Sequence, residues 1–192
     1  KLYCDQSATV KCDAESRVFA IQRGTKQGDP ISPLLFNTVL EQIMRPLKQK
    51  WMKERKGIKL GAAADDTLQS LRFADDLLLI ASSRKHVEDM LRDLMLQART
   101  AGLEVHLGKT KLLSNRIGPD TRLKEVQVNG KPVEVLSPGQ STMYLGRGLN
   151  LRSPHETELN SRISKAWSKF AVFRNELTNK KYPLYQRMRL FN

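Results

Sequence analysis

Two short apolar runs separated by a pair of aspartates form the clearest hydrophobic pattern in the chain. The runs cover residues 71–74 and 77–80, and Asp75 and Asp76 lie between them. Each run has the length of one buried strand, whereas aspartate favours turns because its side chain can bond its own backbone. The pattern therefore predicts a tight β-hairpin with both carboxylates at its tip. For these ten residues alone, a solvated turn is the alternative interpretation.

A first helix is predicted from apolar residues that recur at helical spacing after residue 32. Ser32 is its expected N-cap and Pro33 suits its first turn, where a missing N–H costs nothing. Pro46 is expected to bend or end this helix, which leaves residues 48–59 as a basic, irregular connection. The apolar positions expected to face the core are Phe36, Val39, Leu40, Ile43 and Leu47.

Two further helices are predicted later in the chain. One follows a cap at Ser82 or Ser83 and ends near Gly102. The other opens with a capping box at residues 153–156, and its aromatic side chains are expected in a core rather than free to stack on bases. The aromatic residues expected in the core are Trp167 and Phe170. The apolar positions of these helices are Val87, Met90, Leu91, Leu94, Met95 and Ala98, and then Leu159, Ile163, Ala166, Phe170, Phe173 and Leu177.

Strand candidates are mixed with these helices without a regular βαβ alternation. This order predicts an α+β fold with an antiparallel sheet. The Asn129-Gly130 pair is a hairpin signal within it, and the last helix is expected to begin a second, helical unit. The predicted strands cover residues 2–12, 17–22, 103–107, 109–114, 126–128, 133–136 and 143–146.

Charge is the strongest compositional signal. The formal net charge of +13 over 192 residues predicts a polyanionic partner. No apolar run reaches the roughly 18 residues of a membrane span, and no signal-peptide pattern opens the chain, so no membrane contact is expected. Cys4 and Cys12 are too few for a zinc site and are expected to pack within strands. Since the sequence begins at Lys1 without an initiator Met, and residues 2–10 already resemble the middle of a fold, the chain is expected to be a fragment.

Four sequence blocks follow one another along the chain. Residues 23–37 read RGTKQGDPISPLLFN, residues 73–76 read FADD, Gly102-Leu103 precedes Lys109-Thr110-Lys111, and residues 144–146 read YLG. In this order and spacing the blocks closely resemble the palm domain of reverse transcriptases, particularly those of non-LTR (LINE-like) retrotransposons. The resemblance spans about residues 2 to 180. It implies an antiparallel palm sheet with packed helices over residues 1–150, followed by the beginning of a helical thumb over residues 151–192.

The resemblance implies RNA-templated DNA synthesis, in which two Mg²⁺ ions assist attack of a primer 3′-hydroxyl on a deoxynucleoside triphosphate. Asp75 is the expected primary metal ligand. Asp76 is the second, because neighbours in an extended chain point to opposite faces. A further carboxylate from an earlier strand would complete the site, and Asp5 and Asp13 lack its sequence context. The chain by itself is therefore expected to be inactive.

The remaining blocks are expected to bind substrates. Glycines allow close approach of the backbone to nucleic acid or nucleotide, although a simple capped turn is the alternative. Lys109 is a candidate proton donor to the leaving pyrophosphate, or a phosphate clamp, with a surface lysine as the alternative. The nucleotide- and template-binding candidates are Arg23, Gly24, Lys26, Gln27 and Gly28, and the primer-binding candidates are Tyr144, Leu145, Gly146, Arg162, Lys165 and Lys169.

The expected partners are an RNA template, a DNA primer and deoxynucleoside triphosphates, with Mg²⁺ as the cofactor and the oligomeric state left open. Two other hypotheses are a catalytically dead, nucleic-acid-binding remnant and a reverse transcriptase of group II intron type. The protein is expected to be intracellular, and nuclear if it belongs to a eukaryotic retrotransposon.

Overall fold

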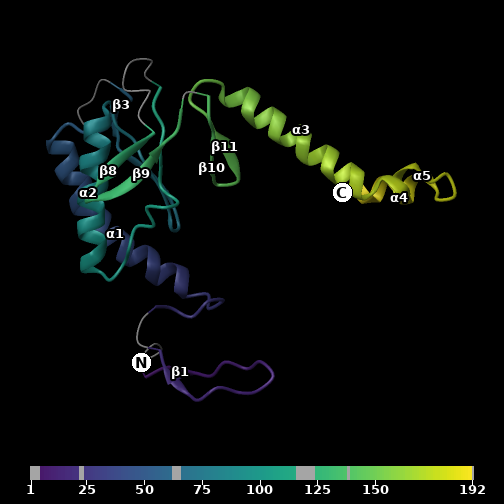
Figure 1. The fold of residues 1–192 in the computed structure, drawn as a ribbon, viewed down its shortest axis with the longest axis horizontal. Helices are drawn as coiled ribbons and strands as arrows, with labels where there is room; N and C mark the ends of the chain where they lie inside the picture. The colour runs from purple at the N-terminus through teal and green to yellow at the C-terminus, as the bar shows by residue number, and fades with distance from the viewer. Residues whose placement is uncertain (1–4, 22–23, 62–65, 116–123, 138, 192) are drawn as a thin grey trace. The chain divides into compact units, whose positions relative to one another are not determined.

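The chain forms two compact units, Lys1–Val105 and His106–Asn192. The structure is a computed structural model that describes residues 5–21, 24–61, 66–115, 124–137 and 139–191 (Figure 1). Helices combine with small, mainly antiparallel sheets, which is compatible with the predicted α+β class. None of the helices within these ranges is long and apolar enough to cross a membrane.

The first unit packs two helices side by side and carries three short hairpins (Figure 1). Its core consists of apolar side chains from both helices, and Met44, Trp51 and Met90 are fully buried. The helices are α1 (Ser32–Lys53) and α2 (Arg84–Thr100), and the strand pairs are β1 (Ser7–Ala8) with β2 (Phe19–Ala20), β3 (Ile58–Lys59) with β4 (Thr67–Leu68), and β5 (Ser70–Phe73) with β6 (Asp76–Leu79).

Helix α1 corrects two expectations. Ser32 is its first helical residue rather than its N-cap, and the Ser32 hydroxyl donates instead to the Lys26 carbonyl at 2.6 Å. The helix also continues through Pro46 to Lys53. A proline removes only one backbone hydrogen bond directly, and the buried side chain of Trp51, one turn and a half further on, holds the continuation against the core. Half of the predicted irregular connection, residues 48–53 of 48–59, is therefore helical, and it ends in strand β3.

Helix α2 confirms its predicted ends. The Ser83 hydroxyl accepts a hydrogen bond from the His86 amide at 3.2 Å, as an N-cap does. At the other end Gly102 has φ +73°, and the amides of Gly102 and Leu103 donate to the carbonyls of Arg99 and Ala98. These two bonds form a Schellman motif, which satisfies the last carbonyls of the helix.

A polar contact ties α1 to α2 beside the core. Asp93 of α2 accepts a hydrogen bond from the Trp51 indole nitrogen at 3.0 Å and an ion-paired bond from Lys50 Nζ at 2.7 Å. Partial burial raises the pKa of the Asp93 carboxyl, but the bonds from Lys50 and Trp51 outweigh it, so that the pKa lies below its ordinary value of 3.8. The hydrogen bond to Asp93 also raises the pKa of Lys50.

This contact predicts a pH dependence of stability. The pKa of Asp93 is lower in the folded chain than in the unfolded one. The ionised carboxylate therefore contributes its full share to the free energy of unfolding above about pH 4, and this share is lost as the pH falls through the pKa of the folded state. Asp93→Asn should therefore lower the free energy of unfolding at pH 6, and the difference from wild type should shrink below pH 4. Denaturant titrations from pH 3 to pH 6 measure this. Asp66→Asn, which makes the same change at an exposed position, is the control and should leave the free energy of unfolding at pH 6 close to that of wild type.

The second unit contains a three-stranded sheet, a hairpin and a helical tail. The predicted hairpin at Asn129-Gly130 is confirmed, with φ +51° and +74° at the two turn residues. The predicted strand pair over residues 103–114 is wrong, because residues 106–110 form turns and only two residues make a strand. The strands are β7 (Lys111–Leu112), β8 (Glu125–Val128) and β9 (Lys131–Val135), in the order β7-β9-β8, and β10 (Thr142–Tyr144) with β11 (Arg147–Leu149).

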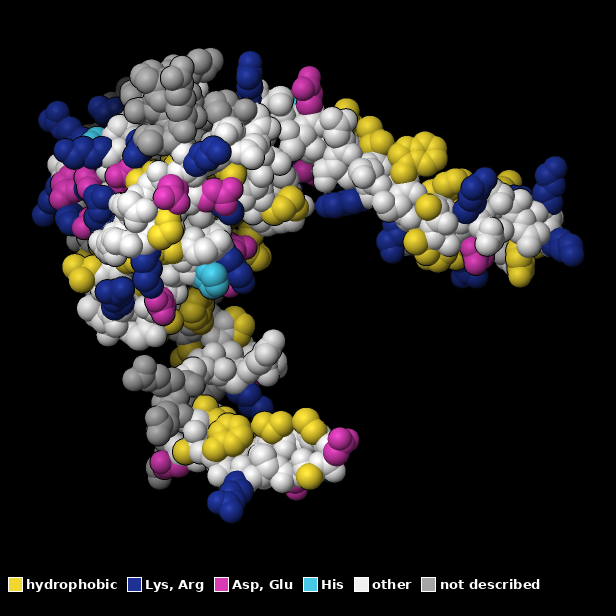
Figure 2. Space-filling model, viewed as in Figure 1, with side chains coloured by type: hydrophobic (Ala, Val, Ile, Leu, Met, Phe, Trp, Pro, Cys, Tyr) yellow, Lys and Arg dark blue, Asp and Glu magenta, His cyan; other side chains and the backbone are white. Residues whose placement is uncertain are grey.

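The helical tail has no buried residue in α3. Trp167, expected in a core, is 66% exposed, and it contacts Phe170 edge-on with ring centroids 5.8 Å apart. Figure 2 shows apolar and basic side chains next to one another along this segment. Ser153 is at the N-cap position, but its side chain makes no capping hydrogen bond. The tail comprises α3 (Pro154–Val172), α4 (Arg174–Thr178), α5 (Leu184–Met188) and a 3₁₀ turn, η2 (Arg189–Phe191).

Candidate functional site

The β5–β6 hairpin presents the two aspartates as the sequence predicts, with one difference. Strand register pairs Phe73 with Asp76, so the two-residue turn consists of Ala74 and Asp75, and Asp76 is the first residue of β6. Ala74 has φ +50°, a left-handed conformation that costs roughly 1–2 kcal/mol for a residue other than glycine. The flanking strand pairs hold the backbone in this tight turn.

The two faces of the hairpin have different environments. Leu77 and Leu79 pack against the helical core, whereas Phe73, on the opposite face, is 66% exposed. The prediction of two buried strands is therefore wrong for one face. On the same face as Phe73, Leu71 is 46% exposed and Asp76 is also exposed.

Both carboxylates of the tip are exposed and unpaired. Across the described ranges, no hydrogen bond or ion pair is found for the side chains of Asp75 and Asp76. Adjacent carboxylates repel unless a cation or proton lies between them, and oxygen ligands are those that Mg²⁺ prefers. The pair therefore suits a hard divalent cation. No group of three or more His, Cys, Asp or Glu side chains placed to hold a metal occurs among the described residues.

The glycine-bearing bend precedes α1 and is attached to its first turn. Gly24 and Gly28 have φ +95° and +87°, conformations that side chains rarely adopt, with open space around both. Besides the bond from Ser32 to the Lys26 carbonyl, the Asp29 carboxylate accepts the Ile31 amide at 3.1 Å. The side chains of Lys26 and Gln27 are exposed. Arg23 lies outside the described residues.

In the second unit, Lys109 lies in a turn rather than a strand. Its backbone amide donates to the His106 carbonyl at 3.0 Å and contacts His106 Nδ1 at 3.2 Å. The Lys109 side chain is exposed, and its role stays a prediction.

The hairpin of β10 and β11 carries Leu145 and Gly146 as its two turn residues, with φ +50° and +76°. Glu158 of α3 attaches this hairpin to the helix. Its carboxylate accepts the Gly148 amide at 3.4 Å and lies 3.7 Å from Arg147 Nε. Tyr144, the remaining residue of the predicted primer-binding turn, is the last residue of β10.

Glu158 also engages one of the predicted primer-binding cations. Arg162 Nε donates to Glu158 Oε1 at 2.7 Å, and this bond, together with the Gly148 amide and the nearby arginines, lowers the pKa of the Glu158 carboxyl. Arg162 is therefore partly neutralised within the helix. Lys165 is exposed, and Lys169 lies 5.9 Å from the ring centroid of Phe173.

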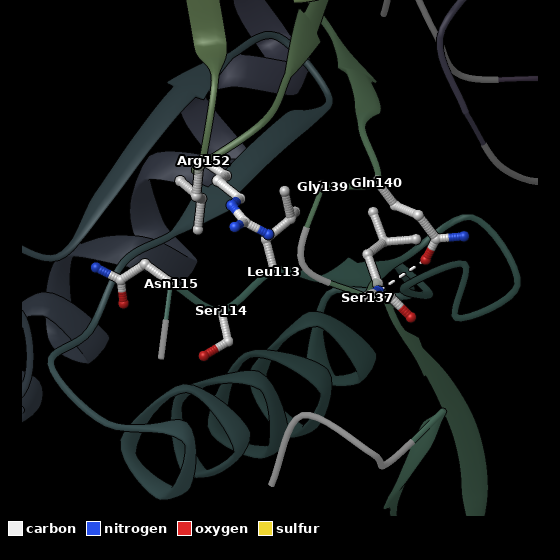
Figure 3. A pocket seen from close by; sticks show the side chains of 9 residues that line it. Leu113, Ser114, Asn115, Ser137, Gly139, Gln140 and Arg152 are labelled. Atoms are coloured by element: carbon white, nitrogen blue, oxygen red, sulfur yellow. Dashed lines mark hydrogen bonds between the residues drawn. The ribbon is translucent and has the colours of Figure 1, made fainter. Parts of the chain in front are cut away.

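A pocket of about 270 Å³ in the second unit was not predicted from the sequence (Figure 3). Buried Asn150 links its parts: the side-chain amide donates to the Gly139 carbonyl at 2.8 Å, and the oxygen accepts the amides of Arg152 and Ser153. Nothing in the local sequence predicted that Asn150 would be buried. The pocket is lined by Leu113, Ser114, Asn115, Leu136, Ser137, Gly139, Gln140, Leu151 and Arg152.

Comparison with known proteins identifies similar sequences. The family described as reverse transcriptase (RNA-dependent DNA polymerase) matches residues 1–149. The chain is 32% identical over 146 residues to the Pol polyprotein of the type-1 retrotransposable element R2 of Nasonia vitripennis, covering 72% of this chain and 13% of that protein. It is 34% identical over 119 residues to a putative transposon-derived protein of Caenorhabditis elegans, covering 59% of this chain and 41% of that one. The chain thus spans less than half the length of either relative.

Proposed function

Because the chain belongs to the reverse transcriptase (RNA-dependent DNA polymerase) family, we propose that it is the part of a non-LTR retrotransposon polymerase that carries the catalytic Asp-Asp turn. The observation that carries this is the exposed β5–β6 tip, where two unpaired carboxylates follow Phe73 in the family's FADD block. The names of the relatives, which refer to retrotransposable elements or a transposon, favour this origin over a group II intron.

Two residues of the chain would hold metal. Asp75 in the turn is the primary ligand, and Asp76, at the start of β6, is the second. A bound pair of Mg²⁺ ions would supply Lewis-acid stabilisation of charge on the attacking and leaving oxygens. The chain's own contribution is to hold two oxygen donors at a fixed turn, and the third carboxylate is assigned to an earlier segment of a longer protein.

The substrates are an RNA template, a DNA primer and deoxynucleoside triphosphates. The glycine-bearing bend offers exposed Lys26 to phosphate and Gln27 to a base or sugar edge, with Gly24 and Gly28 allowing close approach. In the second unit Lys109, the turn at Leu145-Gly146, Lys165 and Lys169 remain candidates for phosphate and primer contacts. We assign residues 1–150 to the palm and residues 151–192 to the start of the thumb, and we expect a nuclear protein in a eukaryotic host.

Primer extension by the full-length protein tests this function. We expect incorporation of deoxynucleotides on an RNA template with Mg²⁺, and loss of incorporation when EDTA removes the metal. Restoring excess Mg²⁺ is the control and should restore synthesis. Salt-sensitive binding of template–primer without any incorporation, with Mg²⁺ present, would instead identify a non-catalytic remnant that keeps only its basic surface.

A further inference from the structure

The ion pair between Arg72 and Glu41 connects the catalytic hairpin to α1. Arg72 lies in β5, three residues before Asp75, and its Nη2 is 3.2 Å from Glu41 Oε2. Strand register places Arg72 opposite Leu77, on the face that packs against the core. We propose that Arg72 and Glu41 are positioning residues, whose ion pair sets the acidic tip in one alignment with α1 and, through α1, with the glycine-bearing bend. This inference rests on the proposed polymerase function.

Helix α1 connects the glycine-bearing bend to Glu41. At its first turn the Ser32 hydroxyl holds the Lys26 carbonyl at 2.6 Å. Glu41 follows Ser32 by nine positions of continuous helix, a rise of about 13.5 Å at 1.5 Å per residue. A helix of this kind is stiff, so the bend and Glu41 are fixed relative to one another. The ion pair from Glu41 to Arg72 then connects α1 to the hairpin, two residues before the turn of Ala74 and Asp75.

Apolar contacts alone define this alignment poorly. Leu77 and Leu79 pack on the core, but hydrophobic attraction has no preferred direction, and small shifts of the hairpin along α1 would bury similar areas. The attraction within an ion pair weakens as the two charges move apart. The Arg72–Glu41 ion pair, with Nη2 and Oε2 3.2 Å apart, therefore favours one position of the hairpin over its neighbours.

Stability does not account for an arginine at this position. The side chains of Arg72 and Glu41 are 26% and 40% exposed, so solvent screens their attraction. Arg72 Nη1 is buried with no hydrogen-bond partner in the described ranges, which is unfavourable. An apolar side chain would suit the neighbouring Leu77 better than an arginine with an unpartnered buried nitrogen. The arginine thus contributes alignment rather than stability.

Glu41 provides a matched control, because a second arginine also contacts it. Arg45 lies one turn further along α1, with its Nε 3.7 Å from Glu41 Oε1, and its side chain is 72% exposed. This pair is contained within one helix and does not reach the hairpin. Removing Arg45 therefore changes the charge around Glu41 without releasing the catalytic tip.

The test compares Arg72→Met with Arg45→Met in the full-length protein. Arg72→Met keeps an aliphatic stem and removes the ion pair, and we expect kcat for RNA-templated extension to fall by roughly tenfold to a hundredfold, since a displacement of about 1 Å can cost about a hundredfold. KM for the nucleotide should change by less than about twofold, because the bend is intact. Arg72→Lys should recover most of the rate, and Arg45→Met should match wild type.

Two measurements separate positioning from folding and do not require activity. Amide hydrogen exchange of α1 and the hairpin should be the same in Arg72→Met as in wild type. Spin labels at Thr25→Cys and Phe73→Cys, with the native cysteines replaced by serine, should give one narrow distance distribution that broadens when Arg72→Met is added. Both label positions lie in exposed segments of the first unit.

The outcomes are distinct. Wild-type kcat and an unbroadened distribution in Arg72→Met would overturn the positioning role, as would faster exchange throughout α1 and the hairpin, which would indicate a structural role. If the full-length wild type fails to extend a primer, the proposed function fails. The distance distributions then still decide whether Arg72 aligns the tip.

Discussion

Asp75→Asn in the full-length protein is expected to reduce RNA-templated primer extension by roughly a thousandfold. The substitution keeps the size of the side chain and removes the charge of the turn residue that faces solvent with no protein partner in the described part of the chain. Metal ions contribute several kcal/mol of charge stabilisation in such reactions, and 1.4 kcal/mol corresponds to tenfold in rate. Loss of a primary ligand should therefore appear in kcat, measured under saturating template–primer and nucleotide.

Asp76→Asn should have a smaller effect, roughly ten- to a hundredfold, for a geometric reason. Asp76 is a strand residue on the same face as Phe73, so its side chain points away from the core-facing side of the hairpin, whereas Asp75 occupies the turn itself. Asp66→Asn, in an exposed position before β4, is the control and should leave extension unchanged. Equal activity of Asp75→Asn and wild type would refute the metal assignment.

Trp51→Ala is expected to lower the free energy of unfolding by about 3–5 kcal/mol, as removal of a large buried aromatic side chain typically does. Trp51 is fully buried in the last turn of α1 and its indole nitrogen donates to Asp93. The alanine leaves a cavity in the core and an acceptor without its donor. Denaturant unfolding followed by circular dichroism measures the loss.

Neighbouring Met52 provides the control for this change. It is on the same helix but 42% exposed, so Met52→Ala should cost less than about 1 kcal/mol. Trp51→Phe keeps most of the apolar volume and loses the hydrogen bond to Asp93. Its loss in free energy of unfolding should therefore lie between those of Trp51→Ala and Met52→Ala. Similar stability of Trp51→Ala and Met52→Ala would contradict the assignment of Trp51 to the core.

Local chemistry explains which elements were predictable. Helix α2 begins after Ser83, whose hydroxyl caps it, and ends shortly before Gly102, which has a positive φ. Asn129-Gly130 forms a hairpin turn. These features were predictable because a cap or a turn depends on the backbone geometry of only a few neighbouring residues. The FADD turn follows the same logic. Its two adjacent carboxylates beside a strand can be recognised from consecutive residues. The order of the four blocks, which indicates the family, can also be read directly from the sequence.

Predictions failed where distant contacts override local preference. Pro46 predicts a helix end, yet burial of Trp51 and its bond to Asp93, 42 residues away, keep α1 helical. Trp167 has an apolar side chain at helical spacing, yet lies exposed, because periodicity shows which face is apolar but not whether anything covers it. The strand-packing role expected for Cys12 is wrong, since Cys12 is exposed and lies in a bend, and Cys4 lies outside the described residues.

The amino-acid order alone specified the family blocks, the acidic turn and the cationic excess, because these depend on residue identity and short spacing. Only the folded chain decided that the hairpin packs one face on α1 and α2 while the other stays open, that Asp76 belongs to the strand, and that Arg72 meets Glu41 rather than the aspartates. Those outcomes depend on which residues become neighbours across tens of positions. Such pairings are set by the packing of a shared core, which no short window of sequence contains.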